Sequence, residues 1–150
     1  MSLQKEAMLT FHWIESTETI EWAELSQLYR IAPLGDKKPA DLAVSFGNSR
    51  FVCFVFNGTQ LVGAGRAMAD GVDCSYLCDI AVHPDYQGAG LGKGIVSRLV
   101  ERSRGHRKII LYSAPGKEAF YRKFGFKPML TAMAIFQKEA DALAGGVIAE

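Results

Sequence analysis

One stretch of the chain, Phe51 to Gly65, restricts the possible folds more than any other. It begins with an unbroken apolar run, Phe51 to Phe56, and a strand that is apolar on both faces predicts helices on both sides of its sheet. Asn57-Gly58 follows and accepts the positive φ angles of a tight turn, so Leu61 to Gly65 is predicted to return as a second strand. The stretch has 15 uncharged residues. A bilayer span needs about 20 apolar residues, so we predict a buried hairpin and no membrane segment.

The other apolar segments predict a mixed α/β domain. We expect strands at 11–14, 76–82 and 108–112, helices through 22–29, 39–46, 91–104 and 117–124, and one or two last strands within 126–137. Hairpins early and βαβ order later indicate a mixed sheet with helices on both faces. No repeat or linker interrupts the pattern, so we predict one domain over residues 1–150, and disorder of the tail 139–150 is left open.

Composition excludes several classes of protein. With 49% hydrophobic and 22% charged residues, the chain is neither collagen-like nor intrinsically disordered. Its three cysteines, Cys53, Cys74 and Cys78, are an odd number, and its histidines are scattered singly, which predicts neither a disulfide framework nor a metal site. The first 20 residues lack the apolar run of a signal peptide. We therefore expect a cytoplasmic protein.

Charge is distributed unevenly along the chain. The net charge is +1, yet residues 1–75 carry six Lys/Arg and nine Asp/Glu, and residues 76–150 carry eleven and seven. This asymmetry suits two differently charged partners, although an uneven surface explains it equally well. The basic cluster within 98–108 lacks the interleaved aromatic residues of a single-strand binding surface, so we predict no nucleic-acid partner.

The glycine-rich segment His83 to Gly94 is the most informative about function. It runs from a predicted strand end into a helix start, where glycines let backbone N–H groups converge and the helix dipole adds positive potential. The segment is therefore predicted to hold an anion. A phosphate-binding P-loop does not fit, because Gln87 occupies the position of the first glycine and Gly94 follows Lys93. A dinucleotide fingerprint fails as well, because its third glycine would fall on Lys93 or Ile95.

The pattern that fits is Q-x-x-G-x-G, written here as Gln87-Gly-Ala-Gly90-Leu-Gly92, after the strand Ile80-Ala-Val82. Farther along, Phe120-Tyr121-Arg-Lys-Phe-Gly125-Phe126 matches F-Y-x-x-x-G-F. With these motifs and this element order, the sequence from Phe11 to Gln137 resembles the GCN5-related N-acetyltransferases (GNAT superfamily). The resemblance implies the GNAT acyl-CoA N-acyltransferase fold. It also implies a transferase that moves an acetyl group from acetyl-CoA to a primary amine of a small molecule or peptide in a ternary complex.

The resemblance assigns the acetyl-CoA site to the strand and the loop. Backbone groups of the strand would pair with the pantetheine arm as if it were an added strand, and loop amides would hold the pyrophosphate. The implied cofactor-binding residues are Ile80, Ala81, Val82, Gln87, Gly88, Ala89, Gly90, Leu91, Gly92 and Lys93. No metal is implied.

Two catalytic residues are predicted. Tyr121 matches the tyrosine that protonates the departing CoA thiolate in many family members, with a packed aromatic as the alternative. Asp79 is the candidate base, because a charge inside an apolar strand is costly unless it is paired or used. A structural ion pair or a solvated edge position is the equally weighted alternative for Asp79. Ordered water, Glu21, Glu24 or no dedicated base are also left open.

Strand alternation complicates the assignment of the base. Simple alternation places Tyr76, Cys78, Ile80 and Val82 on one face and Leu77, Asp79 and Ala81 on the other. A bulge in the strand would change which side chains share a face. A nucleophilic role for Cys78 is disfavoured, since no basic residue lies near it in sequence.

The resemblance places the acceptor pocket at the first helices and their connection. The predicted substrate-binding residues are Tyr29, Arg30, Leu34 and Asp36. Arg30 would suit an acceptor with a carboxylate, and Asp36 would suit a cationic amine. A CoA-binding sensor without turnover is the alternative function. A homodimer is left open, to which the apolar segment 129–136 could contribute.

Overall fold

A computed structural model describes residues 10–150 of the protein. Part of the segment in which we predicted no signal peptide, residues 1–9, lies outside the described residues. The chain divides into two compact units, the first ending at Leu111 and the second covering Tyr112–Glu150. None of the helices in the described part is long and apolar enough to cross a membrane.

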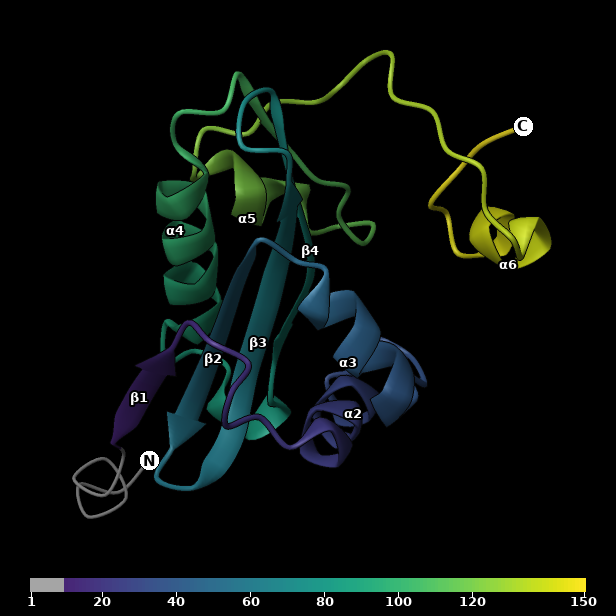
Figure 1. The fold of residues 1–150 in the computed structure, drawn as a ribbon. Helices are drawn as coiled ribbons and strands as arrows, with labels where there is room; N and C mark the ends of the chain where they lie inside the picture. The colour runs from purple at the N-terminus through teal and green to yellow at the C-terminus, as the bar shows by residue number, and fades with distance from the viewer. Residues whose placement is uncertain (1–9) are drawn as a thin grey trace. The chain divides into compact units, whose positions relative to one another are not determined.

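A five-stranded sheet forms the centre of the first unit (Figure 1). Its strands follow one another in sequence order: β1 Phe11–Ile14, β2 Phe51–Asn57, β3 Gln60–Ala69, β4 Cys74–Val82 and β5 Lys108–Ile110. The first four strands are antiparallel, and β5 runs parallel to β4. The mixed sheet and the hairpin of β2 and β3 are therefore confirmed, with Gly58 at φ 59° in the turn.

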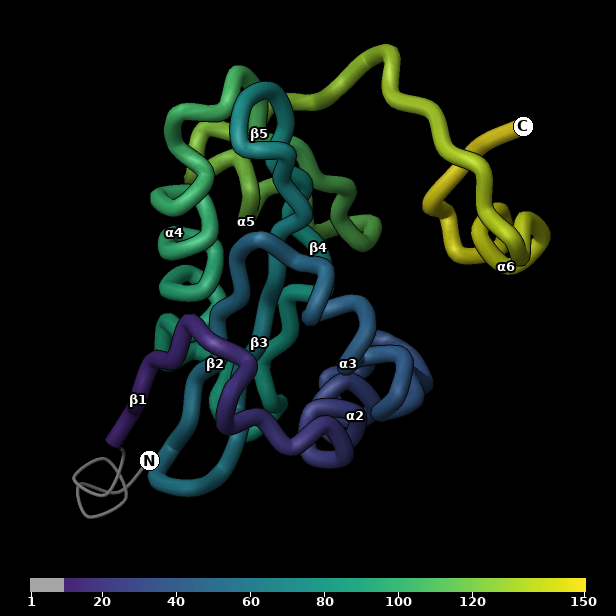
Figure 2. The backbone as a smooth tube through the Cα atoms, in the orientation of Figure 1, coloured from purple at the N-terminus to yellow at the C-terminus, as the bar shows by residue number. Residues whose placement is uncertain are grey.

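Helices cover both faces of this sheet, as the doubly apolar strand predicts. Helices α2 Trp22–Ile31 and α3 Pro39–Gly47 lie on one face, and α4 Leu91–Ser103 lies on the other (Figures 1 and 2). The core between the sheet and the first two helices contains Leu25, Leu28, Tyr29, Leu42, Phe46, Phe54 and Ala64. The apolar residues of α2 recur at helical spacing, so one stripe of the helix is buried.

Helix α4 packs closely on the sheet because glycines face it. A methyl group at Gly65 of β3 would lie 2.7 Å from Ile95 Cγ2 and 3.1 Å from Leu99 Cδ1. At Gly94 of the helix itself, it would lie 2.4 Å from the Trp13 ring of β1. These approaches leave no room for a side chain. They fix the position of the helix whose first turn follows the glycine-rich loop.

Gly65→Ala should therefore destabilise the protein by about 1–3 kcal/mol, because the added methyl overpacks the contact with α4. Gly47→Ala is the matched control, since nothing lies within 4 Å of its added methyl. Gly47 is the last residue of α3, where helix propensity counts for less than in the interior, so this control should change the stability by less than about 1 kcal/mol. Urea unfolding of both variants measures the two free energies. Equal changes in the free energy of unfolding of the two variants would contradict the argument that the added methyl at Gly65 overpacks the contact with α4.

The turn between β3 and β4 is organised by Asp70. Its Oδ1 accepts hydrogen bonds from the backbone N–H groups of Val72, Asp73 and Cys74, at 2.8, 2.7 and 3.2 Å. These bonds lower the pKa of the Asp70 carboxyl from 3.8 to about 2. The stabilisation from the ionised form is therefore present above pH 3.8 and is lost as the pH falls toward 2.

Asp70→Ala should lower the unfolding temperature at pH 7. The difference from the wild type should shrink between pH 4 and pH 2, where the wild-type carboxyl takes up its proton. Thermal unfolding followed by circular dichroism across this range measures the difference, with Asp41→Ala as a control for the loss of a surface carboxylate. A pH-independent difference would mean that the charge of Asp70 does not matter.

The second unit contains two short helices, α5 Glu118–Arg122 and α6 Glu139–Ala144. Gly125 follows α5 with φ 95°, so the predicted helix there is confirmed in a shorter form. The prediction of one or two strands within 126–137 is wrong, because the described part of the chain has no strand after Ile110. Pro128 cannot donate a ladder hydrogen bond, and the described chain offers this segment no paired strand.

Candidate functional site

The glycine-rich loop connects the end of β4 to the start of α4. After a single turn of 3₁₀-helix, η1 Pro84–Tyr86, the backbone passes through Gly88 and Gly90 at φ 88° and 80°. Both angles lie in the left-handed region, which glycine adopts without steric cost. A methyl group at either position would meet nothing within 4 Å, so it is the backbone conformation that requires these glycines, and the space beside them is open.

The first turn of α4 has backbone donors that no residue of the helix uses. Gly90 is the N-cap and provides no side-chain cap, and the first intrahelical bond there runs from Gly94 N to Gly90 O at 3.0 Å. The N–H groups of 91–93 therefore have no partner within the helix. The first turn contains no acidic residue, and Lys93 is exposed in it. Dipole and charge thus favour an anion at this point.

Tyr86 anchors the loop to the β2–β3 hairpin. Its hydroxyl donates to Gln60 Oε1 at 3.0 Å and accepts from Asn57 Nδ2 at 2.9 Å. Its ring makes edge contacts with Phe11 and His83, at centroid distances of 6.2 and 5.5 Å. Sequence reasoning missed this residue, although a tyrosine just before a glycine run was a usable signal. The loop is thereby fixed to a rigid part of the sheet.

Strand β4 offers a free edge next to the loop. Its ladder with β5 includes only Cys74, Ser75 and Tyr76. No strand in the described part of the chain pairs with that side of β4 from Leu77 to Val82. The predicted cofactor strand, Ile80 to Val82, lies on this stretch. An extended chain can bind such an edge by β-strand addition.

A bulge interrupts β4 at Asp79, which has φ 57°. In the register with β3, Ala64 faces Ala81 and Arg66 faces Cys78. Ala64 and Arg66 share a face because they are two residues apart, so Ala81 and Cys78 share it as well. The simple alternation, which put those two on opposite faces, is therefore wrong. Two residues of β4 stand opposite one residue of β3 here, and the register shifts.

Asp79 lies at the centre of a polar network beside the bulge. Its Oδ2 pairs with Arg66 Nε at 2.7 Å, and its Oδ1 lies 3.6 Å from Lys37 Nζ. Its backbone carbonyl accepts a hydrogen bond from the Tyr29 hydroxyl at 2.6 Å. Sequence reasoning missed Arg66 and Lys37. The network joins α2, the α2–α3 connection, β3 and β4, which the sequence could not show as neighbours.

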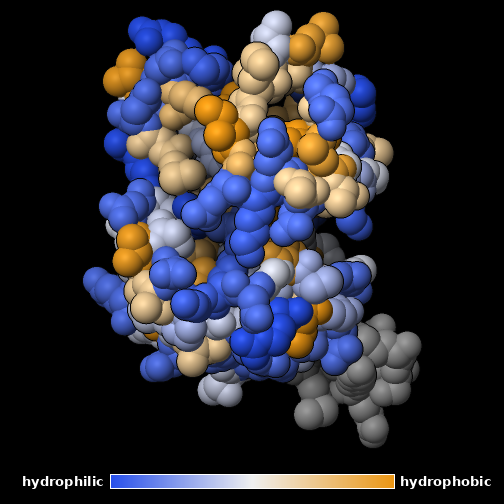
Figure 3. All heavy atoms as spheres, turned by 90° about the vertical axis from the view of Figure 1, so that its right-hand side faces the viewer, coloured by the Kyte–Doolittle hydropathy of each residue, from blue (hydrophilic) through white to orange (hydrophobic). Residues whose placement is uncertain are grey.

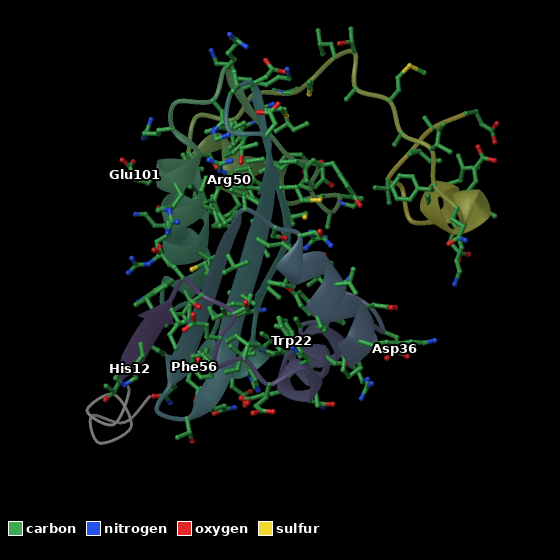
Figure 4. All side chains as sticks on the ribbon, in the orientation of Figure 1. His12, Trp22, Asp36, Arg50, Phe56 and Glu101 are labelled. Carbon is green, nitrogen blue, oxygen red and sulfur yellow. The ribbon has the colours of Figure 1, made fainter. Side chains whose placement is uncertain are left out.

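The predicted acceptor residues are divided between the core and the surface. Tyr29 is completely buried, and burial raises the pKa of its phenol well above the ordinary value, to which the Asp79 charge adds. Arg30 and Asp36 pair with each other on the surface at 3.1 Å, and Figure 4 shows Asp36 pointing outward from the α2–α3 side. Leu34 is 39% exposed. Figure 3 views this side, where hydrophilic residues predominate.

The alternative bases differ in their surroundings. Glu24 Oε1 accepts a hydrogen bond from the backbone N–H of Leu61 at 2.6 Å, which ties α2 to the start of β3. Glu21 is exposed at the N-cap of α2. Burial raises the pKa of the Cys78 thiol to about 11, so it is protonated near neutral pH and a poor nucleophile.

Tyr121 belongs to α5 in the second unit. Its ring makes edge contacts with Phe120 and Phe126, at centroid distances of 5.0 and 6.2 Å. Burial raises the pKa of its phenol above 10.0. The side chain is therefore a protonated hydroxyl over the physiological pH range, as a proton donor must be.

Four basic side chains within 98–108, the cluster considered for nucleic-acid binding, contact aromatic or acidic side chains of the protein itself. Arg98 stacks on the Trp13 ring at 4.1 Å, and Arg102 pairs with Glu15 at 2.7 Å. Arg104 pairs with Glu101 at 2.7 Å, and Lys108 with Asp73 at 2.5 Å. In the described residues, no group of three or more potential ligand side chains could hold a metal ion.

Comparison with known proteins gives consistent results. An N-acetyltransferase of Porphyra purpurea, itself named uncharacterized, is 29% identical over 76% of this chain and 69% of its own length. A glucosamine 6-phosphate N-acetyltransferase of Trypanosoma brucei brucei is 47% identical over 69% of this chain and 78% of its own length. These two relatives are named as N-acetyltransferases.

Solved structures show the same fold. A GNAT family acetyltransferase from Streptococcus pneumoniae superposes with a TM-score of 0.74 at 20% identity, covering 86% of this chain and 99% of that one. At this identity the likeness concerns the fold alone. The sequence model described as "Acetyltransferase (GNAT) family" matches residues 10–126. The chain therefore belongs to the GNAT family of acetyltransferases.

Proposed function

We propose that the protein transfers an acetyl group from acetyl-CoA to a primary amine by direct attack in a ternary complex. The observation that supports this proposal most strongly is that three features follow one another along the chain. They are the unpaired edge of β4, the loop in which Gly88 and Gly90 have left-handed φ angles, and the N-terminus of α4, which has no side-chain cap. These three features together suit a donor with an extended arm and a diphosphate. The family membership supports the same reaction.

The donor would bind along β4 and the loop. Backbone N–H groups of 88–93 would donate hydrogen bonds to the pyrophosphate oxygens, with Lys93 adding charge, and the open space beside Gly88 and Gly90 leaves room for this group. The pantetheine arm would pair with Ile80 to Val82. Because a strand rises about 3.3 Å per residue, an arm that follows β4 back from Val82 for three residues, about 10 Å, reaches the bulge. The thioester would thus lie near Asp79.

The chemistry requires few groups from the protein. The amine nitrogen, in its neutral form, forms a bond to the carbonyl carbon, and the carbon–sulfur bond breaks. The sulfur leaves as a thiolate and takes a proton from the hydroxyl of Tyr121. The amine loses a proton to water, and water returns a proton to the Tyr121 phenolate, which closes the cycle and leaves the Asp79 carboxylate paired with Arg66 and Lys37.

The acceptor is proposed as a small primary amine. The relative with 47% identity is named for glucosamine 6-phosphate, so a phosphorylated amino sugar is the first candidate. The surface pair of Arg30 and Asp36 offers both signs of charge near the α2–α3 connection, which suits an acceptor that carries an anion beside its amine. The expected cytoplasmic location stays a prediction.

Release of free CoA thiol tests this proposal. Purified protein with acetyl-CoA is incubated with glucosamine 6-phosphate, polyamines, amino acids and aryl-alkylamines, and thiol is detected colorimetrically. Thiol release above the rate without acceptor, with the acetylated amine found by mass spectrometry, supports the transferase. If calorimetry shows that acetyl-CoA binds while no amine raises the rate, the protein is a CoA-binding sensor instead.

A further inference from the structure

Lys37 differs from the other lysines in the described part of the chain. Among residues 10–150 it is the only lysine that is not exposed, and 31% of its side chain remains accessible. Lysine side chains are mostly exposed, because taking an ammonium out of water is costly. The next residue, Lys38, is exposed in the ordinary way. Lys37 therefore brings a primary amine partly into the first unit.

The connection between α2 and α3 holds the backbone of Lys37 in place. The buried hydroxyl of Ser26 in α2 donates a hydrogen bond to the Lys37 carbonyl at 2.5 Å. On the other side, the Lys38 carbonyl accepts from the backbone N–H of Leu42 at 3.0 Å, at the start of α3. The Lys37 side chain lies over the ring of Tyr29, with Nζ 5.7 Å from the ring centroid. Both helices thus fix the place from which the amine extends.

The nitrogen of Lys37 ends beside the bulge of β4. It lies 3.6 Å from Asp79 Oδ1, which is longer than a hydrogen bond, whereas Arg66 Nε binds Oδ2 of the same carboxylate at 2.7 Å. One carboxylate therefore faces two cations, and Arg66 is the closer of them. An arginine keeps its proton in proteins, so of these two cations only Lys37 can become a neutral amine. Its deprotonation leaves the ion pair of Arg66 and Asp79 intact.

We propose that Lys37 is an acetylation site of the protein itself, modified by the acetyl-CoA bound along β4. This inference rests on the proposed acetyl transfer, in which the thioester lies near Asp79. Attack requires a nitrogen about 3–3.5 Å from the carbonyl carbon. Lys37 Nζ is within 3.6 Å of the Asp79 carboxylate and stands on a flexible four-carbon side chain. A primary amine of the chain therefore lies close to the place that the proposed reaction gives to the acceptor amine.

The step uses the chemistry proposed for an added amine. The neutral Lys37 nitrogen forms a bond to the carbonyl carbon, the carbon–sulfur bond breaks, and the leaving thiolate takes a proton from the Tyr121 hydroxyl. The nitrogen loses its surplus proton to water, and water returns a proton to the Tyr121 phenolate. The products are the CoA thiol and an uncharged amide at Lys37. Asp79 keeps its ion pair with Arg66, and each chain is modified once at this site.

Mass spectrometry of the full chain incubated with acetyl-CoA alone, without an acceptor, tests this proposal. Uncatalysed acetylation from solution follows exposure, so it favours Lys38 over Lys37. We expect the reverse order, with Lys37 acetylated about tenfold faster than Lys38 or more, because a thioester bound beside an amine has a high effective concentration. Peptide fragmentation assigns the acetyl group to one of these two neighbours, and in urea the preference should disappear. Acetylation of Lys37 no faster than that of Lys38 in the folded protein would overturn the proposal.

Thiol release without an acceptor gives a second readout. The wild type should release CoA thiol in a first phase that stops at about one equivalent per chain, as covalent modification of one residue requires. Lys37→Arg retains a cation beside Asp79 but removes the primary amine, and it should abolish this phase, whereas the matched control Lys38→Arg should retain it. A phase of equal size in both variants would refute self-acetylation at Lys37.

Failure of this inference differs from failure of the proposed function. A wild type that acetylates added amines but modifies Lys37 no faster than Lys38 would overturn the self-acetylation alone. A wild type that binds no acetyl-CoA in calorimetry, or binds it and acetylates neither an added amine nor Lys37, would overturn the proposed transfer and this inference with it.

Discussion

Tyr121→Phe should lower kcat for acetyl transfer by about 100-fold or more, which is the contribution expected of a positioned general acid. The substitution removes one oxygen and retains the ring, so the aromatic contacts with Phe120 and Phe126 are kept. Acetyl-CoA affinity should therefore stay within about twofold, because the role proposed for the phenol is to protonate the departing sulfur and not to bind the donor. Stopped-flow thiol release and calorimetry measure the two quantities.

The pH dependence of the wild type provides an independent check. Burial raises the pKa of Tyr121 above 10.0, so the hydroxyl stays protonated between pH 7 and pH 9 and the rate should lose this donor only at higher pH. Tyr112→Phe makes the same chemical change in the same unit, at a side chain that is 59% exposed, and should leave kcat unchanged. A Tyr121→Phe enzyme with more than half of the wild-type kcat would remove the general-acid role.

Local patterns were sufficient to predict much of the fold and the conformation of the glycine-rich loop. The apolar run Phe51 to Phe56 with Asn57-Gly58 was sufficient for the hairpin and for helices on both faces, because burial and turn geometry are encoded in adjacent residues. Gly88 and Gly90 were identifiable for the same reason, since their left-handed angles are a local requirement. The segment from Gln87 to Lys93 could therefore be assigned as a unit.

Contacts between residues far apart in the chain could not be predicted from the sequence. The bulge at Asp79 arises from a register shift against β3, and its partners Tyr29, Lys37 and Arg66 come from three other elements. Alternation along β4 alone could not reveal this, so it gave the wrong faces. The strand prediction for 126–137 was wrong for a related reason. Apolar composition predicts burial or strand pairing, but it contains no information about which partner strand is present.

Lys93→Glu should change stability and donor binding in opposite directions. A carboxylate in the first turn of α4 interacts favourably with the helix dipole, where the lysine does not, and should stabilise the protein by about 0.3–1 kcal/mol. The same carboxylate would face the pyrophosphate at the uncapped N-terminus. Acetyl-CoA affinity should fall by about 10- to 100-fold, because a charge pair near a protein surface is worth about 1–4 kcal/mol at contact distance.

The control variant Lys38→Glu shows whether a fall in acetyl-CoA affinity comes from the change in net charge or from the position of the charge at Lys93. Lys38 is also exposed and stands at the N-cap of a helix, α3, so this variant has the same net charge as Lys93→Glu and a comparable dipole effect. Its acetyl-CoA affinity, measured by calorimetry without acceptor, should match the wild type. The salt dependence of binding should weaken in Lys93→Glu alone, since screening acts on the charge nearest the diphosphate. If both variants bind acetyl-CoA equally, the pyrophosphate does not lie at the first turn of α4, and the free β4 edge would have to position the donor without it.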